Sequence, residues 1–344
     1  MTHRFPIKEI AAQAGISTAT VDRAINNRSH VSPQTQARVR RALQELENQE
    51  ILLSSTGRRF FFDFIIEAPK RFTTEVSNAL KKATPEIGNA VCRSRFMANE
   101  YLSDDDLIAL LMKIKSRGSH GICLKVRDTS KINEVINDLG KSGIPIVTLV
   151  TDVRNIKKLA YVGLDNAGAG ETAAYLIGKT LKSQTATILT TQSNEFFSGE
   201  TDRERSFEKL IAQNTQKIKF LKIKGGGGLE GPTKRLVYNA VQNVQSIDAV
   251  YSMGGGNKSI ISALEDQNLR PKIFIAHDLD KDNRELLVQK KIDFVLNHNL
   301  TNDLRRVFDA FLSHLGLCTS QPSFTLSDVN IITPFNIPSY IIKL

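Results

Sequence analysis

One arginine and several short polar side chains lie close together near the start of the chain, in a pattern that suits contact with nucleic acid. Arg23 can donate two parallel hydrogen bonds to O6 and N7 of a guanine, and the Ala19 methyl group can meet a thymine methyl. Asp22 can accept from a cytosine amine or orient Arg23. Short polar groups also suit phosphate oxygens, which position a protein without reading sequence. The candidate DNA contacts are Thr18, Ala19, Thr20, Asp22, Arg23, Asn26, His30 and Ser32.

A second group of polar side chains follows predicted strands in the rest of the chain. Asp152 follows the apolar run IPIVTLV, Asp165 follows YVG, and Asn257 follows a run of three glycines. Ligands of open α/β proteins bind at the carboxyl ends of strands, so these residues are candidate ligand contacts. Asp165 has a second interpretation, as the cap of the helix that follows it.

Three predicted helices carry the first group. Apolar residues recur at helical spacing over residues 6–14, and Gly15 suits the left-handed position that ends a helix. Ser17 is a favourable N-cap for a second helix over residues 18–26. A Ser-Pro pair starts a third helix, whose apolar face consists of Val39, Leu43 and Leu46. Two short helices joined by a turn with glycine predict a helix-turn-helix, whose second helix enters the major groove of DNA.

From Phe60 onward, apolar strand-like runs alternate with amphipathic helical segments. This alternation predicts doubly wound parallel sheets, and about 285 residues are too many for one sheet. We therefore expect an α/β fold of two lobes behind a small all-α domain. The first break between the lobes is expected near residue 181.

Composition and motifs exclude several other classes. The net charge of +10 permits a polyanionic partner, and half of it lies in residues 1–44, with seven basic and two acidic residues. The three cysteines, Cys92, Cys123 and Cys318, have no metal-ligand spacing, so neither a disulfide framework nor a metal site is expected. No apolar run suits export or membrane insertion, which favours the cytoplasm. SMGGGNKS lacks the glycine that a phosphate loop needs before lysine, and no hydrolase or zinc motif is present, so we expect no enzyme and no cofactor.

The motifs AGISTATVDRAIN and HVSPQTQARVRRALQEL, within residues 5–47, resemble the DNA-binding headpiece of the LacI/GalR family of bacterial transcriptional regulators. The remainder resembles a type I periplasmic binding protein. The resemblance implies a headpiece (1–47), a hinge or linker (48–59) and a ligand-sensing domain (60–344), with lobes of about 60–180 plus 301–329 and about 181–300 plus 330–344. In this family a hinge leucine wedges into the minor groove. Ser55 occupies that position here and cannot wedge into the minor groove, because such a wedge must be apolar to unstack bases. Leu52 and Leu53 are the nearest apolar residues.

The resemblance also implies further ligand contacts. Phe72 and Thr73 match the family's ligand-facing aromatic pair, with the second ring replaced. Asp278 corresponds to the aspartate that chelates paired sugar hydroxyls, while His298 replaces the usual glutamine. Arg203 occupies the family's arginine position.

The function that these features predict is a cytoplasmic transcriptional regulator, most simply a repressor of genes for carbohydrate or polyol metabolism. A homodimer on a near-palindromic operator is expected, with a sugar, polyol or derivative between the lobes. An α/β enzyme or a carbohydrate-binding protein whose cleft acts on a sugar, with secondary DNA binding, is the alternative.

Overall fold

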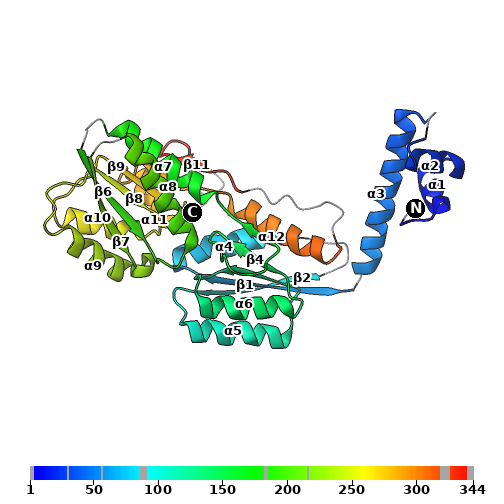
Figure 1. Cartoon of the computed structure of the whole chain (residues 1–344), viewed down its shortest axis with the longest axis horizontal. Helices are drawn as coiled ribbons and strands as arrows, with labels where there is room; N and C mark the ends of the chain where they lie inside the picture. The colour runs from blue at the N-terminus through cyan, green and yellow to red at the C-terminus, as the bar shows by residue number, and fades with distance from the viewer. Residues whose placement is uncertain are drawn as a thin grey trace.

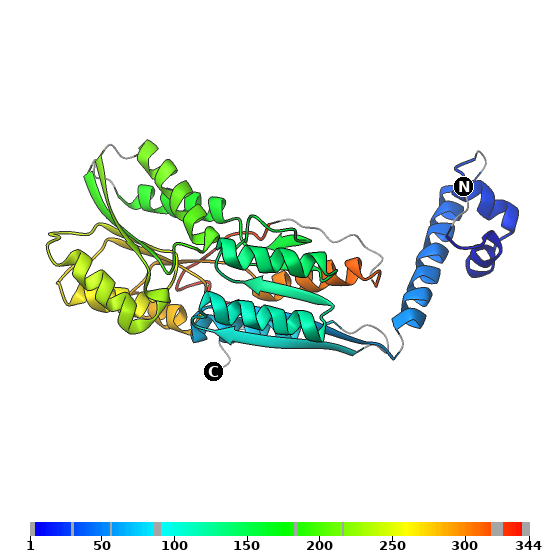
Figure 2. The ribbon, with the colours of Figure 1, turned by 60° about the horizontal axis from the view of Figure 1, so that its bottom comes forward.

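The computed structural model describes residues 4–28, 31–55, 57–85, 91–181, 185–214, 217–317 and 326–338. A small unit of three helices lies at one end, apart from a larger α/β part with two lobes (Figure 1). The same separation is visible after rotation about the horizontal axis (Figure 2). The predicted fold class, two doubly wound lobes behind a small all-α unit, is confirmed.

The N-terminal helices are α1 (Ile7–Ala14), α2 (Thr18–Ile25) and α3 (Pro33–Ser55). Gly15 ends α1 in the left-handed conformation, with a φ of 61°, and Ser17 caps α2 by accepting a hydrogen bond from the Thr20 amide. The core of this unit consists of Phe5, Ile10, Ala11, Val21, Ala24, Val39 and Leu46. Helix α3 is continuous, so residues 48–55 of the predicted linker are helical.

The first lobe contains a parallel sheet with the strand order β2-β1-β3-β4-β5. Its strands are β1 (Arg59–Glu67), β2 (Val91–Asn99), β3 (Gly121–Lys125), β4 (Ile146–Leu149) and β5 (Ala160–Val162). Its helices are α4 (Lys70–Ala83), α5 (Asp104–Arg117), α6 (Ser130–Lys141) and α12 (Leu300–His314). Because side chains alternate along a strand, Phe62 and Phe64 pack with α4 and α12, while Ile65 packs with α5 and α6 on the other face (Figure 1).

The second lobe contains a sheet with the order β11-β10-β9-β8-β6-β7, in which only β11 is antiparallel to its neighbour. Its strands are β6 (Thr185–Gln192), β7 (Lys217–Lys224), β8 (Ala249–Ser252), β9 (Ile273–His277), β10 (Phe294–Asn297) and β11 (Asn330–Ile332). Its helices are α7 (Asn166–Thr180), α8 (Ser198–Asn214), the short η1 (Gly226–Gly228), α9 (Glu230–Val241), α10 (Asn257–Glu265) and α11 (Lys281–Val288). Separate apolar cores cover the two faces of this sheet.

The chain passes between the lobes earlier than the sequence predicts. Helix α7 packs against α8, and Ala173 and Ile177 share a core with Ile188 of β6. The first crossing therefore precedes α7, and the predicted boundary near residue 181 is wrong because α7 buries its apolar face on the second sheet. The chain returns to the first lobe with α12, and β11 again belongs to the second sheet.

Both sheets reverse their strand order beside their first strand. β1 lies between β2 and β3, and β6 lies between β7 and β8. Such reversal points open a crevice at the carboxyl ends of the strands, where open α/β sheets bind ligands. Segments 68–72 after β1 and 193–203 after β6 contribute to one cavity, so the two crevices face each other.

Candidate functional site

Helix α2 presents an exposed face that is suited to DNA. The side chains of Thr18, Ala19 and Arg23 are exposed, while Val21 and Ala24 are buried in the core of the helical unit. Arg23 Nε donates a hydrogen bond of 3.2 Å to the Ala19 carbonyl oxygen, which holds the start of the guanidinium along the helix. The face therefore offers small residues and an arginine to a groove.

Several of the other candidate DNA contacts already make local hydrogen bonds. The Asp22 carboxylate pairs with Arg28 at 3.1 Å and accepts from Asn26 Nδ2 at 2.9 Å, so the alternative that it orients Arg23 is not supported. Thr20 belongs to the N-cap of α2, and Ser32 caps α3 by accepting from the Thr35 amide at 3.1 Å. The side chains of Thr20, Asp22, Asn26 and Ser32 therefore stabilise the ends of the helices and remain partly or fully exposed. His30 lies outside the described residues.

A cavity of about 60 Å³, here called the inner cavity, lies between the lobes. Three of the candidate ligand contacts, Phe72, Arg203 and Asp278, line it. The remaining lining residues are Ala68, Pro69, Arg71, Lys125, Val150, Thr151, Ser193, Phe197, Gly199, Glu200, Met253, Gly254, Gly255, His277 and Asp280. Side chains from segments more than 200 residues apart thus meet only in the folded chain.

Asp278 enters the inner cavity on a strained backbone. Its φ is +64°, and that of Val150 on the opposite wall is +65°, which is rare for a β-branched residue. Strain of this kind persists where surrounding structure holds it, and it concentrates at binding sites. His298 lies behind Asp278, with Nε2 3.7 Å from Oδ1 of that carboxylate. His298 Nδ1 and Asp303 Oδ2 are 2.5 Å apart, and this contact fixes the imidazole ring, so His298 can position Asp278. His298 itself does not line the inner cavity.

Arg203 is buried, and two residues of the second lobe accept hydrogen bonds from its guanidinium group. Its Nε donates to Asn166 Oδ1 at 2.8 Å, and its Nη1 donates to the Met253 carbonyl at 3.1 Å. These contacts fix the plane of the guanidinium against the cavity wall. A fixed planar donor suits adjacent hydroxyl or carboxylate oxygens.

Lys125 is a lining residue that the sequence analysis missed. Its Nζ donates to the Glu67 carbonyl at 3.0 Å and lies 4.1 Å from the ring centroid of Phe197 in the second lobe. Burial lowers the pKa of Lys125, whereas the nearby charge of Glu200 opposes this shift. Burial likewise raises the pKa of Glu200, which accepts hydrogen bonds from the amide and hydroxyl of Ser193. Lys125 ends strand β3, so the rule that ligands bind at strand ends could have identified it.

Besides His298, four candidate residues do not line the inner cavity. Asp165 accepts from the Gly168 amide at 3.0 Å and caps α7, which is the alternative that its sequence position allowed. Asp152 is held by Thr148 and Lys158. Asn257 donates to Asn283 Oδ1 at 2.7 Å, and Thr73 donates to the Lys70 carbonyl oxygen. Each follows a strand, but its side chain is turned into local structure.

The described part of the chain contains no group of three His, Cys, Asp or Glu side chains arranged to hold a metal ion. None of its helices is long and apolar enough to cross a membrane. Cys92 and Cys123 are free thiols, and Cys318 lies outside the described residues.

The geometry defines a class of protein: a helix-turn-helix unit joined to a two-lobed binding domain with a cavity between the lobes. Residues 64–302 match the family model of the periplasmic binding protein domain, and residues 6–49 match that of the bacterial regulatory proteins of the lacI family. The chain belongs to the periplasmic binding protein domain family and carries a lacI-family DNA-binding domain in front. The resemblance to LacI/GalR regulators is thereby confirmed, and neither family is one of enzymes.

Solved structures share this fold. GanP, a glucose-galactose binding protein from Geobacillus stearothermophilus, has 19% identity and a TM-score of 0.72, over 82% of this chain and 99% of GanP. A solute binding protein of an ABC transporter from Burkholderia graminis, in complex with D-arabinose, has 17% identity and a TM-score of 0.72, over 83% and 98%. A candidate LacI transcriptional regulator from Bacteroides fragilis has 12% identity and a TM-score of 0.70, over 81% and 98%. No curated protein sequence matches the chain.

Proposed function

We propose that this protein is a transcriptional regulator whose affinity for DNA responds to a sugar or polyol bound between its lobes. The observation that carries the proposal is the inner cavity, which both lobes line at the carboxyl ends of their strands behind a helix-turn-helix. Asp278 and Arg203 supply paired acceptors and donors there, and Phe72 supplies a ring for an apolar sugar face. The glucose-galactose and arabinose ligands of similar folds favour the same class of compound.

On DNA, the protein acts as a homodimer in the cytoplasm and represses transcription in this proposal. One headpiece offers few base contacts, and two-fold symmetry doubles them on a near-palindromic operator. The candidate base contacts are Thr18, Ala19 and Arg23, because they are exposed on α2. The candidate ligand contacts are Phe72, Arg203, Asp278 and the added Lys125.

The path between ligand and DNA runs through α3. Its last turns lead into β1 of the first lobe, and Ile51 packs against the core of that lobe. A ligand that changes the angle between the lobes can therefore change the spacing of paired headpieces. Such a ligand acts only through its different affinities for the two arrangements.

A thermal-shift screen against sugars, polyols, sugar acids and sugar phosphates tests the proposal. A true effector stabilises the folded protein by about 2.7 kcal/mol at a concentration a hundredfold above its Kd. The variant Asp278→Asn should lose this stabilisation and still bind selected DNA sites. Asp165→Asn is the matched control, since asparagine can also cap α7 and residue 165 does not line the inner cavity. Silence towards every compound would contradict a sugar sensor, and a normal response of Asp278→Asn would remove Asp278 from the site.

A further inference from the structure

A second cavity adjoins the inner cavity and is much larger. This outer chamber has a volume of about 520 Å³, against about 60 Å³ for the inner cavity. Ligand pockets typically measure roughly 300–1,000 Å³, so only the outer chamber is large enough for a whole small molecule. The two cavities share the lining residues Ala68, Pro69, Ser193 and Phe197, and they are therefore adjacent. The inner cavity has room for only a few water-sized groups.

One wall of the outer chamber carries an aromatic ring that is held in place while remaining exposed. Tyr101 is 67% exposed, and the guanidinium carbon of Arg127 lies 5.2 Å from its ring centroid. Arg127 is itself buried and fixed by Glu67, with Nε 2.9 and 3.1 Å from the two carboxylate oxygens, and by Asp104 at 3.0 Å. It also donates to the Leu102 carbonyl oxygen. A guanidinium anchored on one face of the ring leaves the other face open to a ligand.

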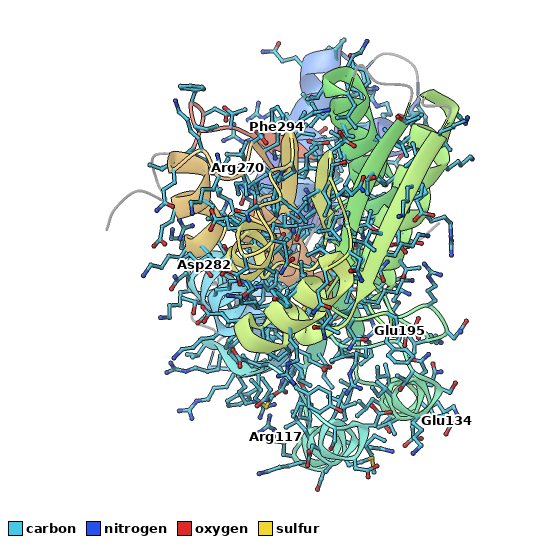
Figure 3. All side chains as sticks on the ribbon, turned by 90° about the vertical axis from the view of Figure 1, so that its left-hand side faces the viewer. Arg117, Glu134, Glu195, Arg270, Asp282 and Phe294 are labelled. Atoms are coloured by element: carbon cyan, nitrogen blue, oxygen red, sulfur yellow. The ribbon has the colours of Figure 1, made fainter. Side chains whose placement is uncertain are left out.

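The opposite wall comes from the second lobe and combines glycine backbone with the side chains of Lys224, Leu229 and Pro232. Residues Gly225, Gly226 and Gly227 line the chamber with φ values of 119°, 80° and 61°, which L-residues with side chains rarely adopt. Glu195 and Glu100 add carboxylates at the rim. Figure 3 shows Glu195 on a loop between the strands of the second lobe and helix α6 of the first lobe, which Glu134 marks. An aromatic ring, a backbone wall and carboxylates together suit a sugar ring, which has apolar faces and hydroxyl edges.

We infer that the effector is a carbohydrate of more than one ring, a disaccharide, short oligosaccharide or glycoside. Its outer ring stacks on Tyr101 in the outer chamber, and its end group reaches Asp278 and Arg203 in the inner cavity. This inference rests on the proposed function and narrows its ligand class. A monosaccharide fits only in the outer chamber and forgoes the charged groups of the inner cavity.

Isothermal titration calorimetry of the full chain with matched sugar series tests the inference. Suitable series are glucose, maltose and maltotriose; glucose, cellobiose and cellotriose; and xylose with xylobiose. In one series we expect the longer sugar to bind at least about tenfold more tightly than its monosaccharide. Tyr101→Ala should weaken binding of the longer sugar at least about tenfold, whereas Tyr101→Phe should keep the affinity because the ring remains.

Tyr175→Ala is the matched control. Tyr175 is 59% exposed on α7, has Lys179 5.3 Å from its ring centroid, and lines neither cavity, so its loss should change no affinity. Equal affinity for a monosaccharide and its longer forms, or an unchanged affinity of Tyr101→Ala for the longer sugar, overturns the inference and leaves the proposed function standing. Failure of every carbohydrate in calorimetry and of every sugar or polyol in the thermal-shift screen overturns both.

Discussion

The residues of the cleft acquire their roles from their neighbours more than from their own chemistry. Asp165 and Asp278 are both aspartates after strands, yet one caps a helix and the other lines the inner cavity. The difference lies in the backbone, because the positive φ of Asp278 turns the chain at the end of β9. His298, which replaces the family's glutamine, lies close behind that carboxylate. A residue's partners therefore decide whether it can meet a ligand.

Arg23 should govern the choice of DNA sequence. Replacing it by alanine removes a bidentate contact to guanine and should reduce discrimination at one base pair by about 1–3 kcal/mol. Fluorescence anisotropy with selected sites and single-base variants measures this loss. Arg41→Ala is the comparison, since Arg41 is exposed on α3 and pairs with Glu45 away from the predicted reading face. If Arg23→Ala weakens all sequences equally, Arg23 contacts phosphate instead of a base.

Asp280 should make stability depend on pH. Burial raises the pKa of Asp280 to about 6, against the pull of the Asn283 amide and Arg71. The folded protein therefore binds this proton more tightly than the unfolded chain, so the contribution favours folding below about pH 4 and is lost as the pH rises to about 6. Asp280→Asn, which can still cap α11, should remove this part of the slope. Urea unfolding between pH 4 and 7.5 measures the free energy of unfolding of the parent protein and of Asp280→Asn. The same dependence on pH in both proteins would contradict the assignment.

At the scale of elements, caps and strand ends place the functional groups. Ser17 caps α2, which carries the candidate DNA contacts. Ser103 caps α5 of the first lobe, and Asp280 caps α11 of the second lobe. The longest helix, α3, joins two functions because its first half completes the DNA-binding unit and its end reaches the first lobe. Leu53 is 80% exposed near that end, while the side chains of Leu52 and Ser55 lie outside the described part of the structure.

Ser17→Ala should destabilise the DNA-binding unit selectively. The Ser17 hydroxyl accepts from the Thr20 amide at 3.2 Å, and loss of such a cap costs about 0.5–2 kcal/mol. A unit of this size has a small core, so this loss is a large part of its stability. Hydrogen exchange should become faster across α1 and α2. Ser103→Ala removes an equivalent cap from α5 and should accelerate exchange in the first lobe only. Faster exchange in the first lobe of Ser17→Ala, or in α1 and α2 of Ser103→Ala, would refute independent folding of the DNA-binding unit and the first lobe.

At the scale of the whole molecule, ion pairs join the two lobes around the cleft. Arg71 of α4 pairs with Asp280 at 2.9 Å, and Glu75 of the same helix pairs with Arg284 of α11 at 2.8 Å. Arg71 Nη1 also donates to the Gly228 carbonyl oxygen at 2.8 Å. These contacts hold the closed arrangement in which the inner cavity is small. Opening of the lobes requires their loss.

Glu75→Gln should shift the sensor towards an open arrangement. The Glu75 and Arg284 side chains are 26% and 20% exposed, so their pair is partly shielded from water and contributes more than a fully exposed pair. Small-angle scattering should report a larger radius of gyration, and effector affinity should fall as the closed population falls. Lys272→Gln is the control, because its pair with Asp248 at 2.8 Å lies within the second lobe. An unchanged radius with unchanged affinity would show that this pair does not hold the lobes together.

The sequence alone determined the local parts of this protein. Helical periodicity, Gly15 and Ser17 predict the helix-turn-helix, and alternating strands and helices predict the two lobes, since both signals depend on neighbours in the chain. Tertiary structure decided the rest. Only packing assigns α7 to the second lobe, and only the meeting of two strand reversals selects Phe72, Lys125, Arg203 and Asp278 from many polar residues at strand ends. Contacts between segments hundreds of residues apart depend on long-range packing, which no local pattern encodes.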